Sequence, residues 1–496
     1  MIKKEASGYR LILGYLGIFL IFASIICFLP LGMLIFYPED SKYIWDFLIP
    51  GLSALAVGIG LFSLIFRRER ARLGKHQDQV LLVLFWLFSV FVCALPFFLS
   101  GNMTFTESVF ESVSGFATVG LTRFTMYDSH IFVFYRSLLL FFGGIGLVLI
   151  VTSALSDRYG LRLYIAEGHN DKLMPNLTKS ARLILLIYAG YILLGTVAFM
   201  FSGMELFDAF NISVSAISTG GFTTKAEGFL ACGGNATVNQ IIACVLMVLG
   251  GTNFLIHFFL ITGRLKRVVK DIEIRFFGMV CVVLIPCFII GFLVTPYDFT
   301  FGESVKYGIF TFISSITTSG LTNTPVNFSF SLAHGVVLLV ILCSIIGGGM
   351  GSTSGGSKQY RFALAFKSFI WNVRYRSGSN RMVYPHQVYR LGQSKEVSQH
   401  ERNEALGYIL LYVTFLIFGT FILIAAGGGD FSFEDCFFEF ANGLSSAGLT
   451  CGLTTQANPG MLWVMIIGMF AGRLEIMPIY YAIYRSTRDI VGKETV

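Results

Sequence analysis

Four short stretches decide the fold of this chain, and they share one pattern of residues. They read Ala117-Thr118-Val119-Gly120-Leu121-Thr122, Ser218-Thr219-Gly220-Gly221-Phe222-Thr223, Thr317-Thr318-Ser319-Gly320-Leu321-Thr322 and Ser445-Ser446-Ala447-Gly448-Leu449-Thr450. The first two positions of each stretch hold small or hydroxyl residues, and the third holds another small residue. The fourth position is glycine, the fifth is leucine or phenylalanine, and the sixth is threonine. The shared glycines are 101, 99 and 128 residues apart, and the longer interval contains a basic linker around residues 352–406. This self-similarity indicates an internal fourfold repeat.

A modest apolar segment precedes each stretch and is too short to cross a membrane. The four segments are 106–116, 207–217, 304–316 and 434–444. Three of them open with an acid 13 residues before the glycine: Glu107, Asp208 and Asp435. A carboxylate there suits the N-terminus of a helix. In the third repeat Glu303 lies 17 residues before the glycine, which predicts a short helix about one turn longer.

A short helix followed by a glycine-bearing turn, between two long apolar segments, is typical of a re-entrant pore loop. Non-helical backbone is tolerated at membrane depth only where it lines an aqueous path or is buried in protein. Carbonyl groups from four such loops can replace the water shell of a monovalent cation, and glycine permits the backbone angles that this needs. Ordinary turns are the alternative, but they do not explain why four aligned loops each lie between apolar segments.

The composition independently indicates a membrane protein. Of 496 residues, 55% are hydrophobic and 13% are charged, whereas soluble domains carry about 25% charged residues. This excludes a disordered, collagenous or coiled-coil chain and makes a soluble enzyme untenable. The net charge of +7 does not indicate a nucleic-acid partner, because the basic residues follow the pattern of membrane connections described next.

Ten apolar segments have the length of a membrane span. They are 11–36, 44–66, 79–99, 132–154, 183–202, 239–263, 277–295, 333–350, 407–426 and 461–484. Thirty of the 36 Lys and Arg residues fall on alternate connections or at the termini, which predicts that these parts are cytoplasmic. The first segment is too long for a signal peptide and is expected to be retained.

The loops and the span pattern resemble the Trk/Ktr/HKT superfamily of potassium transporters, and most of all a bacterial Trk-type potassium uptake membrane subunit. The resemblance implies an all-α polytopic membrane protein with four pseudo-fourfold helix–pore loop–helix repeats, similar to potassium-channel subunits, plus two N-terminal membrane helices. It divides the chain into an N-terminal region (1–75) and pore repeats 1 (76–158), 2 (159–268), 3 (269–400, with a gating loop and cytoplasmic linker) and 4 (401–496). The first four residues of each stretch would form the potassium filter, and Gly120 is the position where glycine accompanies potassium permeation in this superfamily.

A second motif follows the third loop. It runs Gly347-Gly348-Gly349-Met350-Gly351-Ser352-Thr353-Ser354-Gly355-Gly356-Ser357-Lys358, and so many glycines cannot form a stable helix. By resemblance this stretch is an intramembrane gate below the filter, with Gly347, Gly348, Gly349, Gly351, Ser352, Thr353, Gly355 and Gly356 as its residues. A flexible cytoplasmic linker remains an alternative. A phosphate-binding loop does not fit, because Lys358 is followed by Gln359 and a membrane segment stands in front.

The last gate residue is Arg473, within the final apolar segment. A cation in the membrane is costly unless it meets water or a partner. By resemblance Arg473 projects into the pore below the filter and raises the barrier for potassium. A structural arginine paired with carbonyl groups of another helix is the alternative. The glycine clusters 143–146 and 250–253 are expected first to allow close helix packing and second to line the lower pore.

Together with the span pattern, the resemblance implies a gated potassium pore of the bacterial inner membrane, and the basic connections predict that both termini are cytoplasmic. The alternative is a proton- or sodium-coupled transporter of potassium or another monovalent cation, although Glu475 is the only acid in the middle of a predicted span. No enzyme motif or metal-ligand spacing is present, and potassium is the only ion expected, without an organic cofactor. The resemblance implies a homodimer with Trk-A-type cytoplasmic subunits that bind nucleotides.

Overall fold

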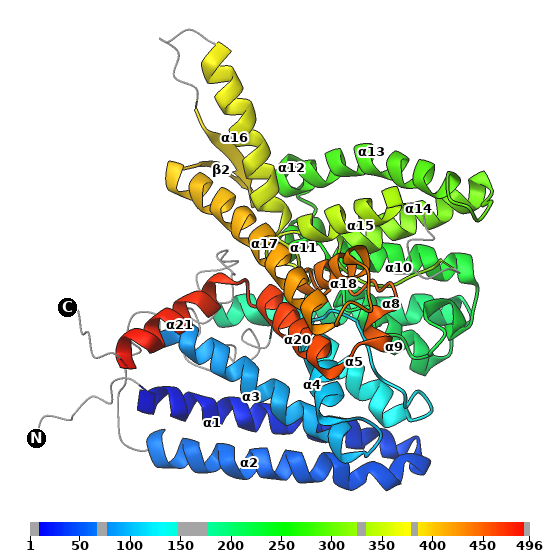
Figure 1. Ribbon diagram of the computed structural model, residues 1–496, viewed down its shortest axis with the longest axis vertical. Coiled ribbons are helices and arrows are strands. Elements are labelled where there is room, and N and C mark those ends of the chain that lie inside the picture. Colours follow the sequence, from blue (N-terminus) through cyan, green and yellow to red (C-terminus); the bar gives the residue numbers. More distant parts are fainter. Residues whose placement is uncertain (1–8, 67–76, 147–176, 325–333, 378–384, 491–496) are drawn as a thin grey trace, which may run out of the picture.

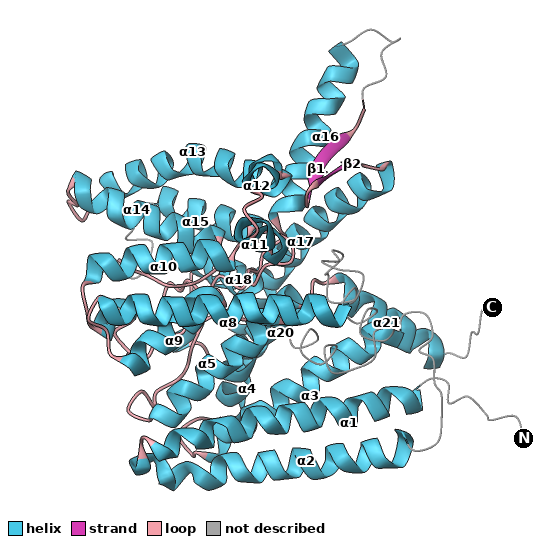
Figure 2. Cartoon of the chain, turned by 180° about the vertical axis from the view of Figure 1, so that it is seen from behind, coloured by secondary structure: helices cyan, strands magenta, loops and turns pink. Residues whose placement is uncertain are grey.

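The computed structural model describes residues 9–66, 77–146, 177–324, 334–377 and 385–490. Within these ranges the chain is built almost entirely of helices, as the sequence predicts. The helices α1, α2, α10 and α13 run in similar directions, whereas α16 and α17 lie obliquely to them, and α1 begins at the same end of the molecule at which α21 finishes (Figures 1 and 2). The one β-sheet among the described residues is a short hairpin, which the all-helical expectation did not include.

The two N-terminal helices form a tightly packed pair. The segment comprises α1 (Tyr9–Phe28), the short 3-10 helices η1 (Leu29–Ile35) and η2 (Pro38–Tyr43), and α2 (Ile44–Phe66). A Cβ atom added to Gly17 would lie 2.7 Å from the carbonyl oxygen of Gly58, and one added to Gly58 would lie 2.8 Å from that of Gly17. Glycine at both positions therefore lets the two backbones touch, as is common between membrane helices.

Each of the four repeats contains a long outer helix, a short helix and an inner helix. Repeat 1 has α3 (Gln77–Leu99), α4 (Phe105–Phe116) and α5 (His130–Ile145). Repeat 2 has α8 (Leu177–Phe201), α9 (Leu206–Ile217), η3 (Phe229–Cys232), α10 (Ala236–Gly250), α11 (Phe254–Ile261) and α12 (Leu265–Lys270). Repeat 3 has α13 (Ile272–Leu293), α14 (Phe301–Ile316), α15 (His334–Ile346), α16 (Gln359–Ser377), β1 (Gln387–Arg390) and β2 (Gln393–Glu396). Repeat 4 has α17 (Gln399–Ala426), α18 (Phe433–Leu444), α19 (Leu453–Gln456), α20 (Pro459–Arg473) and α21 (Met477–Ile490).

The prediction of ten continuous spans is wrong for the inner helices. Among the described residues six helices are long and apolar enough to cross a membrane, or up to eight if each bent pair is one span. The predicted span 239–263 bends by 108° between α10 and α11, and 461–484 bends by 101° between α20 and α21. The apolar helices α5 and α15 have only 16 and 13 residues, and positions 147–154 of the predicted span 132–154 lie outside the described residues.

Side-chain contacts to the backbone stabilise the bend between α10 and α11. The Asn253 side chain accepts a hydrogen bond from the N–H of Leu255 (2.9 Å) and so starts α11 anew. On the other side of the bend, His257 Nε2 lies 2.9 Å from the carbonyl oxygen of Leu249. Hydropathy does not register such contacts, so the sequence predicted an unbroken helix.

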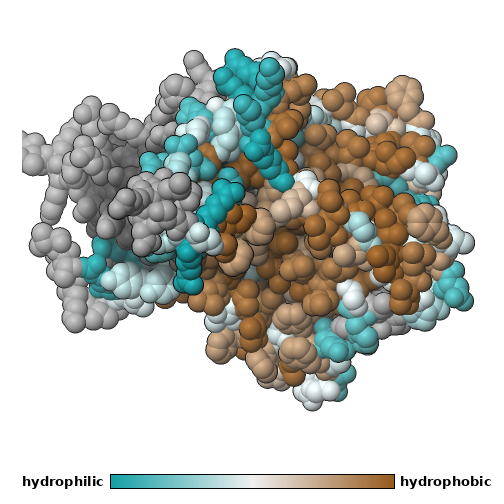
Figure 3. Space-filling view, turned by 90° about the horizontal axis from the view of Figure 1, so that it is seen from above, coloured by the Kyte–Doolittle hydropathy of each residue, from teal (hydrophilic) through white to brown (hydrophobic). Residues whose placement is uncertain are grey.

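The surface fits a lipid environment. Large apolar side chains are exposed on the outward faces of the helices; examples are Leu194, Val282, Leu338, Leu410 and Phe418. In Figure 3 the apolar residues form a broad area, with hydrophilic residues gathered toward its two ends. An exposed apolar surface of this size indicates contact with lipid or protein.

Candidate functional site

The four repeated stretches adopt one backbone conformation. The second residue of each has a positive φ angle: 50° at Thr118, 52° at Thr219, 53° at Thr318 and 57° at Ser446. The shared glycines Gly120, Gly221, Gly320 and Gly448 follow, with φ angles of 94°, 74°, 76° and 64°. L-residues rarely adopt such angles, so four threonine or serine residues in this conformation mark a deliberately shaped turn.

The four glycines form a closed ring. A Cβ atom added to Gly120 would lie 2.5 Å from the carbonyl oxygen of Gly220, one on Gly221 2.7 Å from that of Ser319, and one on Gly320 2.6 Å from that of Ala447. The ring closes because a Cβ on Gly448 would overlap the carbonyl oxygen of Val119. Four carbonyl groups, one from each repeat, therefore lie side by side around one axis, at positions where only glycine fits.

The short helices α4, α9, α14 and α18 each end at one of these turns. An acidic residue lies in the first turn of each helix, at Glu107, Asp208, Glu303 and Asp435. Thr104 with Glu107 and Thr300 with Glu303 form complete capping boxes. The helix α14 has 16 residues against 12 in the other three, which confirms the longer third helix. The negative ends of four helix dipoles thus meet at the ring.

The inner helices pack against the ends of the short helices through glycine. A Cβ on Gly143, Gly250 or Gly472 would overlap the carbonyl oxygen of the last residue of the short helix in the same repeat, which is Phe116, Ile217 or Leu444. The expectation that the glycine clusters allow close packing is therefore confirmed by contact. These clusters also mark the ends of α5 and α10.

The glycine-rich stretch between α15 and α16 lies directly under the ring. Its residues are buried, apart from the half-buried Gly351, so a flexible cytoplasmic linker is the wrong interpretation. The Ser354 hydroxyl donates to the carbonyl oxygen of Thr317 (2.7 Å), and the N–H of Gly355 donates to Thr318 Oγ1 (2.7 Å). Thr353 Oγ1 donates to the carbonyl oxygen of Ile217 (2.9 Å). The stretch is thus bonded to the turns of repeats 2 and 3.

Arg473, the last residue of α20, joins this stretch to the inner helix of repeat 1. Its Nη1 donates to the carbonyl oxygen of Thr353 (2.9 Å), and its Nη2 donates to that of Gly143. Arg473 also lines a cavity of about 30 Å³ together with Lys358 and Glu475, and the glycine-rich stretch forms another wall. A cavity of this size holds about one water molecule or ion. The bonds to carbonyl oxygens are those expected of a structural arginine, and the barrier for potassium stays a prediction.

A β-hairpin contacts the same stretch from the other side. Strands β1 and β2 pair antiparallel, with Arg390 opposite Gln393. The two residues of the turn between them, Leu391 and Gly392, have positive φ angles. Arg390 Nε lies 3.7 Å from Glu273 Oε1, and Glu273 Oε2 accepts from the N–H of Met350 (3.0 Å). Asp271 Oδ2 accepts a hydrogen bond from the N–H of Leu391 (2.8 Å). The hairpin, α13 and the glycine-rich stretch are therefore one connected polar assembly.

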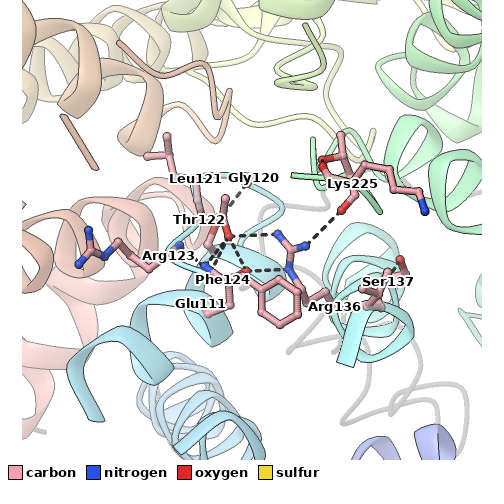
Figure 4. A network of polar contacts seen from close by, with 12 residues as sticks. Glu111, Gly120, Leu121, Thr122, Arg123, Phe124, Arg136, Ser137 and Lys225 are labelled. Carbon is pink, nitrogen blue, oxygen red and sulfur yellow. Dashed lines mark hydrogen bonds and ion pairs between the residues drawn. The ribbon is translucent and has the colours of Figure 1, made fainter. Parts of the chain in front are cut away.

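A polar network that was not predicted from the sequence lies behind the ring. Glu111 and Arg136 form a buried ion pair at 2.7 Å, and Thr122 donates to the same carboxylate (Figure 4). Glu439 is buried at the corresponding place in repeat 4. The available signal was an acid nine residues before the shared glycine in the first and last repeats. These acids lie in the short helices, outside the ten predicted spans.

The fold and the site define the class of four-repeat pore-loop membrane proteins. Similar chains include a Trk system potassium uptake protein of Salmonella typhimurium, 32% identical over 443 residues that cover 85% of this chain and 88% of the relative. Another is that of Escherichia coli K12, 31% identical over 463 residues, with 86% and 93% covered. The crystal structure of a potassium transporter from Vibrio parahaemolyticus superposes with a TM-score of 0.82 at 25% identity, covering 95% of this chain and 97% of that one. The chain belongs to the TrkH family of cation transport proteins, whose family model matches residues 51–487.

Proposed function

We propose that this protein carries potassium into a bacterial cell through a single gated pore in the cytoplasmic membrane. The observation that carries the proposal is the closed ring of Gly120, Gly221, Gly320 and Gly448, in which each glycine contacts one carbonyl group of the neighbouring repeat. The relatives named as potassium uptake proteins support potassium as the transported ion. The first four residues of each stretch act as the filter, because only backbone carbonyls and hydroxyls are available there to replace water.

The glycine-rich stretch 347–356 acts as the gate, together with Arg473. Support comes from its position: it is bonded to turns of the ring above, to Arg473 at the side and to Glu273 below. The stretch has no helical hydrogen bonds of its own and is held by separate bonds to neighbouring segments, such as those from the N–H groups of Gly349 and Thr353 to Gly251 and Gly250, so it can move without unfolding a helix. When it moves away, Arg473 loses the carbonyl oxygen of Thr353, and the path below the ring opens.

Regulation follows from the cytoplasmic hairpin. The protein works as a homodimer with nucleotide-binding Trk-A-type subunits on its cytoplasmic face, and both termini lie on that face. A partner that displaces the hairpin pulls on Arg390, and through Glu273 on Met350 of the gate. The division of the chain at residues 75, 158, 268 and 400 places this hairpin in repeat 3, beside the gate that it controls.

A potassium flux assay in proteoliposomes with a clamped membrane potential tests the proposal. Passive flux that follows the electrochemical gradient of potassium is expected in liposomes without a proton or sodium gradient. Flux that requires such a gradient would instead support a coupled transporter. The observation that favours this second candidate is Glu439, a buried carboxylate whose partners in the described chain are hydroxyl, thiol and N–H groups.

A further inference from the structure

Two carboxylates lie at the same register behind the ring. Glu111 precedes Gly120 by nine residues, and Glu439 precedes Gly448 by nine residues. Both side chains are fully buried, at 0% exposure. A buried carboxylate is costly unless hydrogen bonds satisfy it, so the contacts of these two groups show what they hold in place.

Both carboxylates hold the segment that leaves the ring, and they do so with the same two contacts. In repeat 1, Thr122 Oγ1 donates to Glu111 (2.9 Å), and so does the N–H of Arg123 (3.1 Å). In repeat 4, Thr450 Oγ1 donates to Glu439 (2.7 Å), as does the N–H of Cys451 (3.0 Å). The donors are in each case the second and third residues after the shared glycine. The carboxylate therefore ties the far end of the turn to its own short helix.

Repeats 2 and 3 cannot make this contact. Ile212 and Thr311 occupy the register of the two glutamates. In repeat 2, Thr223 Oγ1 donates to the carbonyl oxygen of Lys225 instead (2.9 Å). The carboxylate ties are therefore confined to repeats 1 and 4, which are neighbours in the ring because the Gly448 contact closes onto Val119.

Arg136 extends the tie from repeat 1 to repeat 2. Its Nε donates to Glu111, its Nη2 donates to Thr122 Oγ1 (3.1 Å), and its Nη1 donates to the carbonyl oxygen of Thr223 (3.2 Å). Its guanidinium carbon lies 4.0 Å from the ring centroid of Phe222, in repeat 2. Figure 4 shows Arg136 reaching between the two turns. The planar guanidinium suits this role because it presents several donors in a fixed geometry.

We propose that Glu111 and Glu439 are positioning residues that set the selectivity of the filter, with Arg136 as the link to repeat 2. The inference rests on the proposed filter function of the ring. Discrimination between potassium and the smaller sodium ion requires that the carbonyl groups keep their spacing, and a ring is only as rigid as the groups that hold it from behind. Without the hydrogen bonds to the carboxylate, the turn of that repeat can shift, and its carbonyl group can then move inward to coordinate the smaller sodium ion.

The test compares potassium-to-sodium permeability ratios, measured from reversal potentials of purified, folded protein in planar bilayers. Glu439→Gln leaves no arginine unpaired, but its NH2 group replaces one acceptor oxygen and therefore opposes the donor of either Thr450 or Cys451. Thr450→Val removes the other end of the contact and changes no charge. Both variants are expected to lower the ratio about tenfold, which corresponds to about 1.4 kcal/mol. The matched control Glu303→Gln, which changes an exposed capping carboxylate in repeat 3, should leave the ratio unchanged.

The outcomes separate this inference from the filter proposal. If Gly120→Ser changes the ratio while folded Glu439→Gln and Thr450→Val do not, the ring is the filter and the positioning role is wrong. If Gly120→Ser also leaves the ratio unchanged, the filter proposal itself fails, and the inference fails with it. A loss of protein yield at an unchanged ratio would show that the carboxylates serve only folding.

Discussion

Replacing Arg473 with alanine should increase potassium flux per folded molecule. Arg473 lines the cavity under the ring and donates to the carbonyl oxygens of Thr353 and Gly143. The substitution removes a positive charge from the proposed ion path and also one anchor of the proposed gate. Both changes act in the same direction, because the first lowers the barrier for a cation and the second frees the glycine-rich stretch.

The size of the effect follows from the dimensions of the cavity. An ion inside a space of about 30 Å³ lies within roughly 5 Å of the groups that line it, and at an effective dielectric constant of about 20 a unit charge there contributes about 3 kcal/mol. Removing such a barrier raises a rate by at most about a hundredfold. Lys358 lines the same cavity and keeps part of the barrier, while Glu475 is paired with Arg361 at 2.6 Å. We therefore expect an increase of about tenfold to a hundredfold.

The assay is rubidium uptake into proteoliposomes, divided by the amount of folded protein from size-exclusion chromatography. Arg473→Lys keeps the charge and should stay within about threefold of the parent, although one ammonium group cannot reproduce the guanidinium fork. Arg376→Ala, which removes an exposed charge at the end of α16, serves as the control. A lower flux per folded molecule in Arg473→Ala would refute the barrier role, and a lower thermal stability alone would identify a structural anchor.

Three further predictions concern the ring, the gate and the hairpin. Gly120→Ser places a Cβ 2.5 Å from a carbonyl oxygen of the next turn, at a φ of 94°, so the ring must open and reversal potentials should show more sodium permeation. Deleting residues 348–351 should raise basal flux and weaken its dependence on a regulatory subunit; flux that stays regulated as before would identify a hinge. Glu273→Gln weakens a charge-assisted hydrogen bond to the N–H of Met350, worth about 1.5–3 kcal/mol. Basal flux should rise several-fold, whereas an unchanged basal flux would show that Glu273 does not couple the hairpin to the gate.

The repeat pattern made the pore loops predictable from the sequence. Each loop combines a short apolar helix, an acid in its first turn and a glycine shared by all four repeats, and these features are local along the chain. The positive φ angles of Thr118 and its counterparts were not predictable, because threonine does not favour them. They arise from the ring, in which each turn is confined by the next one.

The bends of the inner helices could not be predicted for a different reason. Hydropathy sums the polarity of side chains, whereas the bends depend on hydrogen bonds between distant segments. Asn253 caps a new helix start, and His257 lies against a carbonyl oxygen that the bend releases. The Glu111–Arg136 pair was missed similarly, since its two residues are 25 positions apart and each looks isolated in an apolar segment.

The four repeats share one backbone arrangement but differ in the residues around the ring. They can differ because they are joined in one chain and need not have identical sequences. Four identical subunits would place four identical loops under the ring. Here only repeat 3 carries the glycine-rich stretch, and it bonds to the turns of repeats 2 and 3. Repeats 1 and 4 hold the carboxylates that fix their turns from behind. The glycine-rich stretch also packs on the turn of repeat 4, because a Cβ on Gly355 would overlap the carbonyl oxygen of Ser445. The turns of repeats 2 and 3 are hydrogen-bonded to the proposed gate and have no carboxylate behind them, so movement of the gate should act on them most strongly.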